Sequence, residues 1–285
     1  MAISVAGDAA NLAQLPVRTP FREFVDGGLK RWLPAPWYWR YRAWRQGQGD
    51  VEMQLLPLLC DRHKSSIDVG ASIGAYAVHL LLHSARCWAF EPRPRAAAYL
   101  ARSLTMRPDP RLRVETVALS DQLGEALLRV AIADQGRSTL EGANPIKDMP
   151  ECAELRVPTR RLDDYAGLVS PVGMIKVDVE GHEEAVLRGA RALLARDRPA
   201  VLVEIEERHK PGSIAAVTRL LEELGYRGFF YRDRLLHRME SFTVETHQDV
   251  SRLGEKINGE SAYVNNFVFL AGDSLARLRP LTGEP

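Results

Sequence analysis

A glycine turn between a short apolar strand and a helix constrains this chain more than any other feature. Residues 65–74 read Ser-Ser-Ile-Asp-Val-Gly-Ala-Ser-Ile-Gly, and the apolar segment 75–82 that follows has the spacing of a helix. Glycines in such a turn let a ligand approach the backbone, and the start of the helix presents N–H groups without intrahelical partners. The sequence therefore predicts a ligand-binding strand–turn–helix unit here.

Two acidic residues indicate the charge of the ligand. Asp68 precedes Gly70 and Gly74 in a spacing that differs from the Gly-x-Gly-x-x-Gly of dinucleotide sites. A carboxylate here would repel a pyrophosphate and attract a cofactor that carries ammonium and sulfonium charges. Glu91 ends the next apolar run, 87–90, where an acid can accept both hydroxyl hydrogens of a ribose. Together they predict S-adenosylmethionine; the alternative is an ordinary strand–helix–strand unit with chance acids.

Composition narrows the class of protein. The 285 residues, 46% hydrophobic and 26% charged, suit a soluble globular chain of one domain with an extension, or of two small domains. A formal net charge of +1 does not favour nucleic-acid binding by the chain as a whole. The three cysteines are widely separated and indicate neither a disulfide framework nor a zinc site. No stretch reads as a signal peptide or a spanning helix, so the expected location is cytoplasmic, with peripheral membrane contact left open.

Residues 21–45 differ in composition from the rest of the chain. Four of the five tryptophans, at positions 32, 37, 39 and 44, lie here among five arginines and Lys30. Such a segment could cover a sugar or an anionic substrate, or dock on a membrane; alternatively, the indoles pack onto the main domain. We predict an aromatic-rich, helical N-terminal extension over 1–50 and an S-adenosylmethionine-binding domain over 51–285.

Beyond the glycine turn, strands alternate with helices, which is typical of an open and mostly parallel sheet flanked by helices. The polar segment 136–150 reads as a long loop near the cofactor edge. The further predicted strands are 114–119, 124–132, 155–157, 173–179, 200–205, 228–231 and 263–270, and the predicted helices are 51–60, 95–104, 185–194 and 214–224.

These motifs, in this order, resemble the FkbM family of S-adenosylmethionine-dependent methyltransferases. The matching segments are 67–74, Ala-Phe-Glu-Pro at 89–92, Val-Ala-Leu-Ser-Asp at 117–121, Arg-Leu-Asp-Asp at 161–164, Met-Ile-Lys-Val-Asp-Val-Glu-Gly-His-Glu at 174–183, 187–190, 203–205 and 224–226. The resemblance implies a class I methyltransferase Rossmann-like α/β fold and an oxygen acceptor, commonly a hydroxyl of a sugar, glycan or polyketide-type metabolite. Ser72 stands where the family usually has Asn, and His182 where it often has a small residue.

Acidic residues at the carboxyl ends of two strands are the catalytic candidates, because ligands bind there in open α/β sheets. Alternation places Lys176, Asp178 and Glu180 on one face if their strand extends that far. We expect Asp178 to contact the methionine end of the cofactor and the acceptor hydroxyl, and Glu180 or His182 to assist proton removal. Lys176 is expected to pair with Asp68 or Asp178, with a catalytic role as the alternative.

The predicted cofactor contacts span three strand ends. They comprise Asp68, Gly70, Ala71, Ser72 and Gly74 in the first turn, Glu91 and Pro92 at the ribose, and Ser120 and Asp121 near the adenine. Glu204, Glu206 and His209 could hold a divalent ion with Asp178, but no tight ligand spacing favours this, so no metal site is predicted.

Rival functions remain at this stage. The function of a nicotinamide-dependent oxidoreductase is not supported, because the Gly-x-Gly-x-x-Gly motif is missing. The function of a nucleic-acid methyltransferase is not supported either, because the chain has no Asn/Asp-Pro-Pro-Tyr/Phe motif to hold a flipped base. A catalytically idle methyltransferase-like domain that serves as a binding scaffold is the principal alternative. The expected partner is a small-molecule or saccharide acceptor, and the oligomeric state is open.

Overall fold

The computed structural model describes residues 51–106, 109–131, 138–142, 144, 152–257 and 260–282. The predicted N-terminal extension over 1–50 and most of the loop 136–150 lie outside these ranges. Within the described ranges, no helix has the length and apolar character that a membrane crossing requires.

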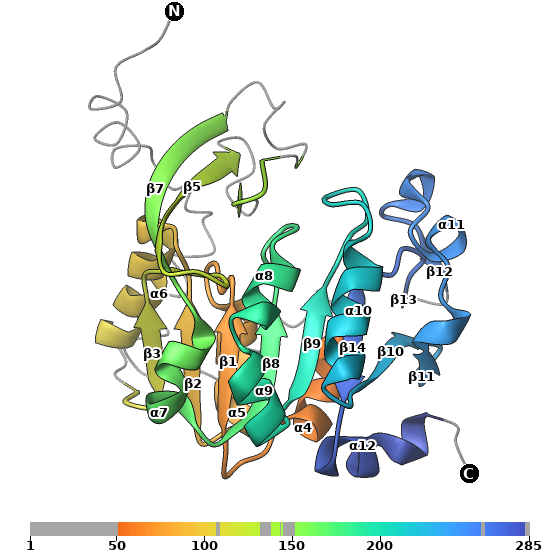
Figure 1. Cartoon of the computed structure of the whole chain (residues 1–285). Coiled ribbons are helices and arrows are strands. Elements are labelled where there is room, and N and C mark those ends of the chain that lie inside the picture. Colours follow the sequence, from red (N-terminus) through yellow and green to blue (C-terminus); the bar gives the residue numbers. More distant parts are fainter. Residues whose placement is uncertain are drawn as a thin grey trace, which may run out of the picture.

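An eight-stranded sheet forms the centre of the molecule (Figure 1). In spatial order its strands are β11 (Leu235–Arg238), β10 (Arg227–Arg232), β14 (Asn266–Leu270), β9 (Ala200–Glu204), β8 (Val172–Val177), β1 (Ser65–Val69), β2 (Arg86–Phe90) and β3 (Leu112–Glu115). The five strands from β9 to β3 are parallel, whereas β14 runs antiparallel to both of its neighbours and β11 antiparallel to β10. The prediction of a mostly parallel sheet is confirmed.

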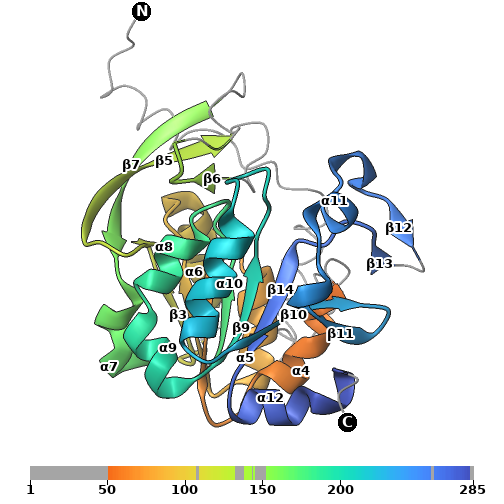
Figure 2. The same ribbon diagram turned by 45° about the vertical axis from the view of Figure 1, so that its right-hand side comes forward.

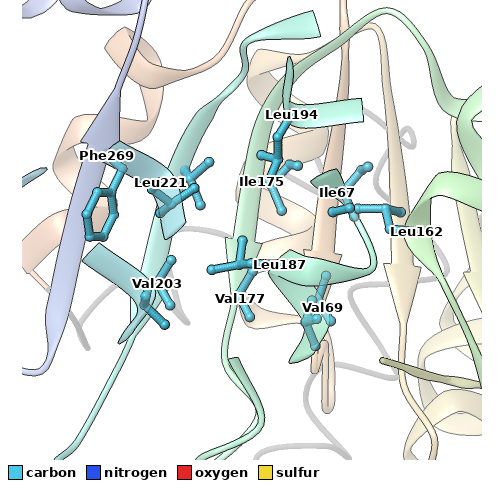
Figure 3. Close-up of a cluster of buried hydrophobic side chains, with 14 of the residues drawn as sticks. Ile67, Val69, Leu162, Ile175, Val177, Leu187, Leu194, Val203, Leu221 and Phe269 are labelled. Carbon is cyan, nitrogen blue, oxygen red and sulfur yellow. The ribbon is translucent and has the colours of Figure 1, made fainter. Parts of the chain in front are cut away.

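Helices cover both faces of this sheet (Figure 1). One face carries α8 (Glu183–Arg188), α9 (Arg191–Asp197) and α10 (Ser213–Glu223), and the other α4 (Leu56–Leu59), α5 (Ala75–His83), α6 (Pro94–Met106) and α12 (Asp273–Leu278). Every residue of β1 and of β8 is buried, as expected for parallel strands covered on both sides. Figure 3 shows Ile67, Ile175 and Val203 of three neighbouring strands in one cluster with Leu187, Leu194 and Leu221 of the covering helices. Burial of each such side chain contributes roughly 1.5–3 kcal/mol.

A second, four-stranded sheet lies beyond the carboxyl ends of the main strands (Figures 1 and 2). Its order is β4 (Ala118–Leu119), β7 (Cys152–Arg160), β5 (Gly124–Ala131) and β6 (Ser138–Thr139), with β5 and β7 paired antiparallel over eight residue pairs from Gly124↔Thr159 to Ala131↔Cys152. The remaining elements are η1 (Val51–Leu55), η3 (Leu162–Tyr165), α7 (Ala166–Val169), η4 (Met239–Ser241), α11 (Val244–His247), η5 (Val250–Arg252), β12 (Lys256–Ile257), β13 (Glu260–Ser261) and η6 (Arg279–Leu281).

The predicted strand 114–119 is wrong as a single element. β3 ends at Glu115, and β4 begins at Ala118 in the other sheet, parallel to β7. Ala118 packs with Leu128 and Val157 in a small cluster under the second sheet, whereas Leu119 belongs to the main core. A stretch that reads as one strand can thus be divided between two sheets, and the spacing of its apolar residues does not show where it divides.

The predicted helix 185–194 is two helices, α8 and α9, which are separated at Gly189 and Ala190. A Cβ atom on Gly189 would overlap the backbone carbonyl oxygen of Ser120, the residue that follows β4. The glycine therefore lets the end of α8 lie directly against this backbone. Asp163 accepts hydrogen bonds from the N–H groups of Ala192 and Leu193, at 3.0 and 2.8 Å, and so caps the start of α9. A contact from a distant segment therefore sets this break.

Other boundaries shift by a few residues. The helix predicted over 51–60 is η1 followed by α4, the strand predicted over 173–179 ends at Val177, and the strand predicted over 263–270 begins its ladder at Asn266. Gly225 takes the left-handed conformation after α10, with φ of +78°, as its predicted helix-ending position requires.

Candidate functional site

A cavity opens at the carboxyl ends of β1, β2, β8 and β9, below the second sheet. It encloses about 690 Å³ of non-atom space, part of which is open solvent at its mouth. The predicted site residues that line it are Gly70, Ser72, Glu91, Pro92, Asp178, Glu180 and His182. The predicted residues outside its lining are Asp68, Ala71, Gly74, Ser120 and Asp121. Glu204, Arg93, Ser138 and Thr139 complete the polar part of the wall.

The glycine turn after β1 is packed against the turn after β8. Gly70 has φ of +81°, and a Cβ atom there would overlap the backbone carbonyl oxygen of Asp178. The N–H of Asp178 in turn donates to the carbonyl of Val69 at 3.0 Å. Ser72 also has a positive φ, +49°, a conformation that Asn tolerates better than Ser. The strict need for glycine at position 70 therefore comes from the close approach of two backbones at the cavity.

Glu91 ends β2 at the cavity wall, where the sequence predicts the ribose acid. It is 1% exposed, and its Oε2 accepts a hydrogen bond from the N–H of Ser72 at 2.7 Å. Arg93 holds the same carboxylate from the other side, with Nε 2.8 Å from Oε1 and Nη2 3.2 Å from Oε2. Sequence reasoning missed Arg93, although its place two residues after the acid is a visible signal.

A buried polar network lies beneath the cavity. Lys176, fully buried in β8, donates to Asn266 Oδ1 at 3.0 Å, and its Nζ lies 3.7 Å from Glu204 Oε2 and 4.9 Å from the centre of the Tyr76 ring. It is also the register partner of Asp68, whose pKa its charge lowers. The ion pair of Lys176 is thus with Glu204 and its hydrogen bond with Asn266, whereas the predicted partner Asp68 is influenced through charge. Several polar partners favour the burial of an ammonium group.

Burial dominates the titration of two carboxyl groups near the site. It raises the pKa of Asp68 to about 7, with Lys176 opposing, and it raises the pKa of Glu183 to about 7, with the N–H of Gly181 opposing. The folded protein therefore keeps protons that the unfolded chain releases above about pH 4. The stability from these groups is complete below about pH 4 and is lost as the pH rises through about 7.

We expect Asp68→Asn to flatten the pH dependence of stability. Between pH 5 and pH 8 the free energy of unfolding of the wild type should fall, by at most about 1.4 kcal/mol per pH unit for each group, and Asp68→Asn should lose one of the two contributions. Urea denaturation at several pH values measures this. Asp273→Asn, at an exposed position in α12, is the control and should keep the wild-type slope. A wild-type slope in Asp68→Asn would contradict the assignment.

The turn after β8 carries the three predicted catalytic residues. Because β8 ends at Val177 and Glu180 has φ of +53°, the strand does not extend to Glu180, and the condition for Lys176, Asp178 and Glu180 to share one strand face is not met. The backbone oxygen of Glu180 accepts hydrogen bonds from Thr139 Oγ1 and Asn144 Nδ2, both at 2.7 Å. The side chain of Glu180 lies 3.1 Å from Nδ1 of His209. Residues from the segment predicted as a long loop thus hold this turn at the cavity.

His182 joins two segments that are distant in the sequence. Its Nδ1 is 2.7 Å from Glu141 Oε1, and its Nε2 is 2.9 Å from the hydroxyl of Ser120. The hydrogen bond from His182 lowers the pKa of Glu141, with Lys210 adding to the effect. Ser120, predicted near the adenine, therefore meets His182, while Val117, Ala118 and Leu119 just before it line the cavity. Glu141 is a site residue that the sequence did not indicate.

The acids considered as metal ligands are engaged by cations or amides. Both Glu206 oxygens accept hydrogen bonds from Arg208, and Glu204 Oε1 accepts one from Asn265 at 2.8 Å. His209 Nε2 lies 3.8 Å from Glu206. In the part of the chain that the structure describes, no group of three or more His, Cys, Asp or Glu residues is arranged to hold a metal ion.

Comparison with known proteins shows which family this chain is similar to. The family model described as "Methyltransferase FkbM domain" matches residues 68–227, which is more than half of the chain. A protein described as "Methyltransferase 1" from Beauveria bassiana (strain ARSEF 2860) is 27% identical over 178 residues, covering 56% of this chain and 71% of its own length.

Solved structures of similar architecture share little sequence. A methyltransferase FkbM from Methylobacillus flagellatus KT is 17% identical with a TM-score of 0.46, and the match covers 73% of this chain but only 44% of that one. A putative methyltransferase from Streptococcus mutans, solved in complex with SAH, is 11% identical with a TM-score of 0.43, covering 78% of this chain and 96% of that one.

Proposed function

Because this chain belongs to the FkbM methyltransferase family, we propose that it transfers the methyl group of S-adenosylmethionine to a hydroxyl of a sugar, glycan or polyketide-type metabolite. The observation that carries the proposal is the shared cavity, which brings Glu91 at the end of β2 together with the Gly70 turn and the Asp178–His182 turn. The division into an extension over 1–50 and a methyltransferase domain over 51–285 is part of the same proposal.

The proposed cofactor site uses the edge formed by β1 and β2. Glu91 accepts the ribose hydroxyls, and Gly70 lets the cofactor approach the backbone of the turn. Asp68 lies buried behind the turn and contributes negative charge to the site when ionised. Bound here, S-adenosylmethionine supplies an activated methyl group. Asp178, which lines the cavity beside Gly70, orients the ammonium of the methionine end and the acceptor hydroxyl.

The proposed proton acceptor is His182. An ionised Glu141 accepts the Nδ1–H of His182, which leaves the lone pair of Nε2 facing the hydroxyl of Ser120. In this tautomer Nε2 can receive the proton of an acceptor hydroxyl. Before the acceptor binds, Nε2 is hydrogen-bonded to the hydroxyl of Ser120. A base so placed accelerates alkylation of an alcohol by roughly 10²–10⁴. Glu180, held against His209, is the second candidate for this role.

Calorimetric titration with S-adenosylhomocysteine tests the cofactor site. We expect the wild type to bind S-adenosylhomocysteine with micromolar affinity and not to bind NADH. Glu91→Ala should weaken S-adenosylhomocysteine binding by about 10- to 100-fold, because charge-assisted hydrogen bonds to the ribose are lost. Glu222→Ala, at an exposed position on α10, is the matched control and should bind like the wild type. If the wild type bound no S-adenosylhomocysteine, with or without Mg²⁺, the idle-scaffold alternative would replace this proposal.

A further inference from the structure

The carboxylate of Glu91 already has a full set of hydrogen-bond donors. Oε1 accepts from the backbone N–H of Arg93 at 2.9 Å and from its Nε at 2.8 Å. Oε2 accepts from the N–H of Ser72 at 2.7 Å and from Arg93 Nη2 at 3.2 Å. A carboxylate offers about four lone-pair positions, so these four donors leave none for the two hydroxyls of a ribose. A ribose can bind Glu91 only if one or more of them is displaced.

Among these donors, the guanidinium is the one on a side chain, whereas the other two are backbone N–H groups. The N–H of Ser72 belongs to the turn after β1, and the backbone of Arg93 is fixed because its carbonyl accepts the N–H of Ala97 at 3.0 Å at the start of α6. The Arg93 side chain, in contrast, lines the cavity and is joined to the fold through rotatable bonds. Rotation of this one side chain therefore frees two acceptor positions on Glu91.

The charge of Arg93 adds to this competition. Arg93 is 8% exposed and Glu91 is 1% exposed, so their fork-shaped ion pair is shielded from water and strong. A guanidinium in the wall also repels a cofactor that carries ammonium and sulfonium groups. The ion pair stabilises the empty site relative to the loaded one.

We propose that Arg93 is a latch on the ribose-binding acid, which must release Glu91 before an adenosine-containing cofactor can bind. Cofactor affinity is then set by the exchange of the guanidinium for ribose hydroxyls, and Arg93 lowers that affinity. The inference rests on the proposed function, in which Glu91 binds the ribose of S-adenosylmethionine. It assigns to Arg93 a role opposite to that of an ordinary binding-site arginine.

Calorimetry on the full chain with S-adenosylhomocysteine tests the latch. We expect Arg93→Ala to bind roughly tenfold more tightly than the wild type or better, because one or more charge-assisted hydrogen bonds no longer have to be broken. Arg93→Lys keeps the charge but loses the two-pronged contact, so its affinity should lie between those two. Arg113→Ala, at an exposed position in β3, is the matched control and should bind like the wild type.

A second pair of probes locates the effect at the ribose. Arg93→Ala should gain affinity for adenosine and gain little for 2′,3′-dideoxyadenosine, which lacks both hydroxyls. Unchanged or weaker binding of S-adenosylhomocysteine by Arg93→Ala, while the wild type binds, would overturn the latch and leave the proposed function standing. If neither protein bound it, the proposed function and the latch would both fall. Thermal unfolding of each variant checks folding, and Arg93→Lys decides the question if Arg93→Ala does not fold.

Discussion

Gly70→Ala is expected to destabilise the protein by about 3 kcal/mol or more and to abolish binding of S-adenosylhomocysteine. The left-handed conformation costs a residue with a Cβ atom roughly 1–2 kcal/mol, and forcing extra atoms into a packed site costs roughly 1–3 kcal/mol. Here the obstacle is the backbone carbonyl of Asp178, which cannot rotate away as a side chain would. Relief requires the turns after β1 and β8 to separate, and both turns line the cavity.

Gly212→Ala is the control that separates the two contributions. Gly212 has a similar φ of +82°, but a Cβ atom there would meet no other atom within 4 Å. This variant should lose only the conformational contribution of roughly 1–2 kcal/mol and keep its affinity for S-adenosylhomocysteine. Urea denaturation and calorimetry of the two variants make the comparison. Equal losses of stability, with binding intact in both, would show that the contact between the two turns is not rigid.

The parts of the fold that depend on local sequence could be predicted. Strand β1, the left-handed turn at Gly70 and Gly74, and helix α5 follow from one stretch of ten residues and the apolar segment after it. The alternation of strands and helices gave the mostly parallel sheet, and the class I methyltransferase fold and the FkbM family are confirmed. These features are encoded by neighbours in the chain, so no knowledge of distant contacts was needed.

The contacts that complete the site could not be read from spacing. Glu141 meets His182 across 41 positions of sequence, and Lys176 meets Asn266 across 90. The break at Gly189 likewise depends on the backbone of Ser120, a residue of another segment. Arg93 is the instructive exception, because it is close to Glu91 in sequence. Its effect still required knowing that the carboxylate is buried and that three of its four donors come from Arg93 itself.

The second large effect is expected at Asp178. Its side chain is half-buried in the cavity wall beside Gly70, and its backbone N–H, bound to Val69, is unaffected by a change of side chain. Asparagine has nearly the same shape but no charge, so Asp178→Asn should fold like the wild type. It should lose about 10²-fold or more in turnover, because the acceptor hydroxyl and the cationic methionine end are no longer oriented by a common anionic partner.

Formation of S-adenosylhomocysteine, measured with an acceptor found by screening sugars, glycans and polyketide-type alcohols, tests Asp178→Asn. Asp273→Asn is the control for loss of one carboxylate at an exposed position. A second readout does not depend on the acceptor: Asp178 raises the pKa of Asp68, so its replacement should lower that pKa and shift the pH dependence of stability toward acid. Near-wild-type turnover together with that shift would show that Asp178 acts on the buried network alone, and would transfer the orienting role to Glu180 or His182.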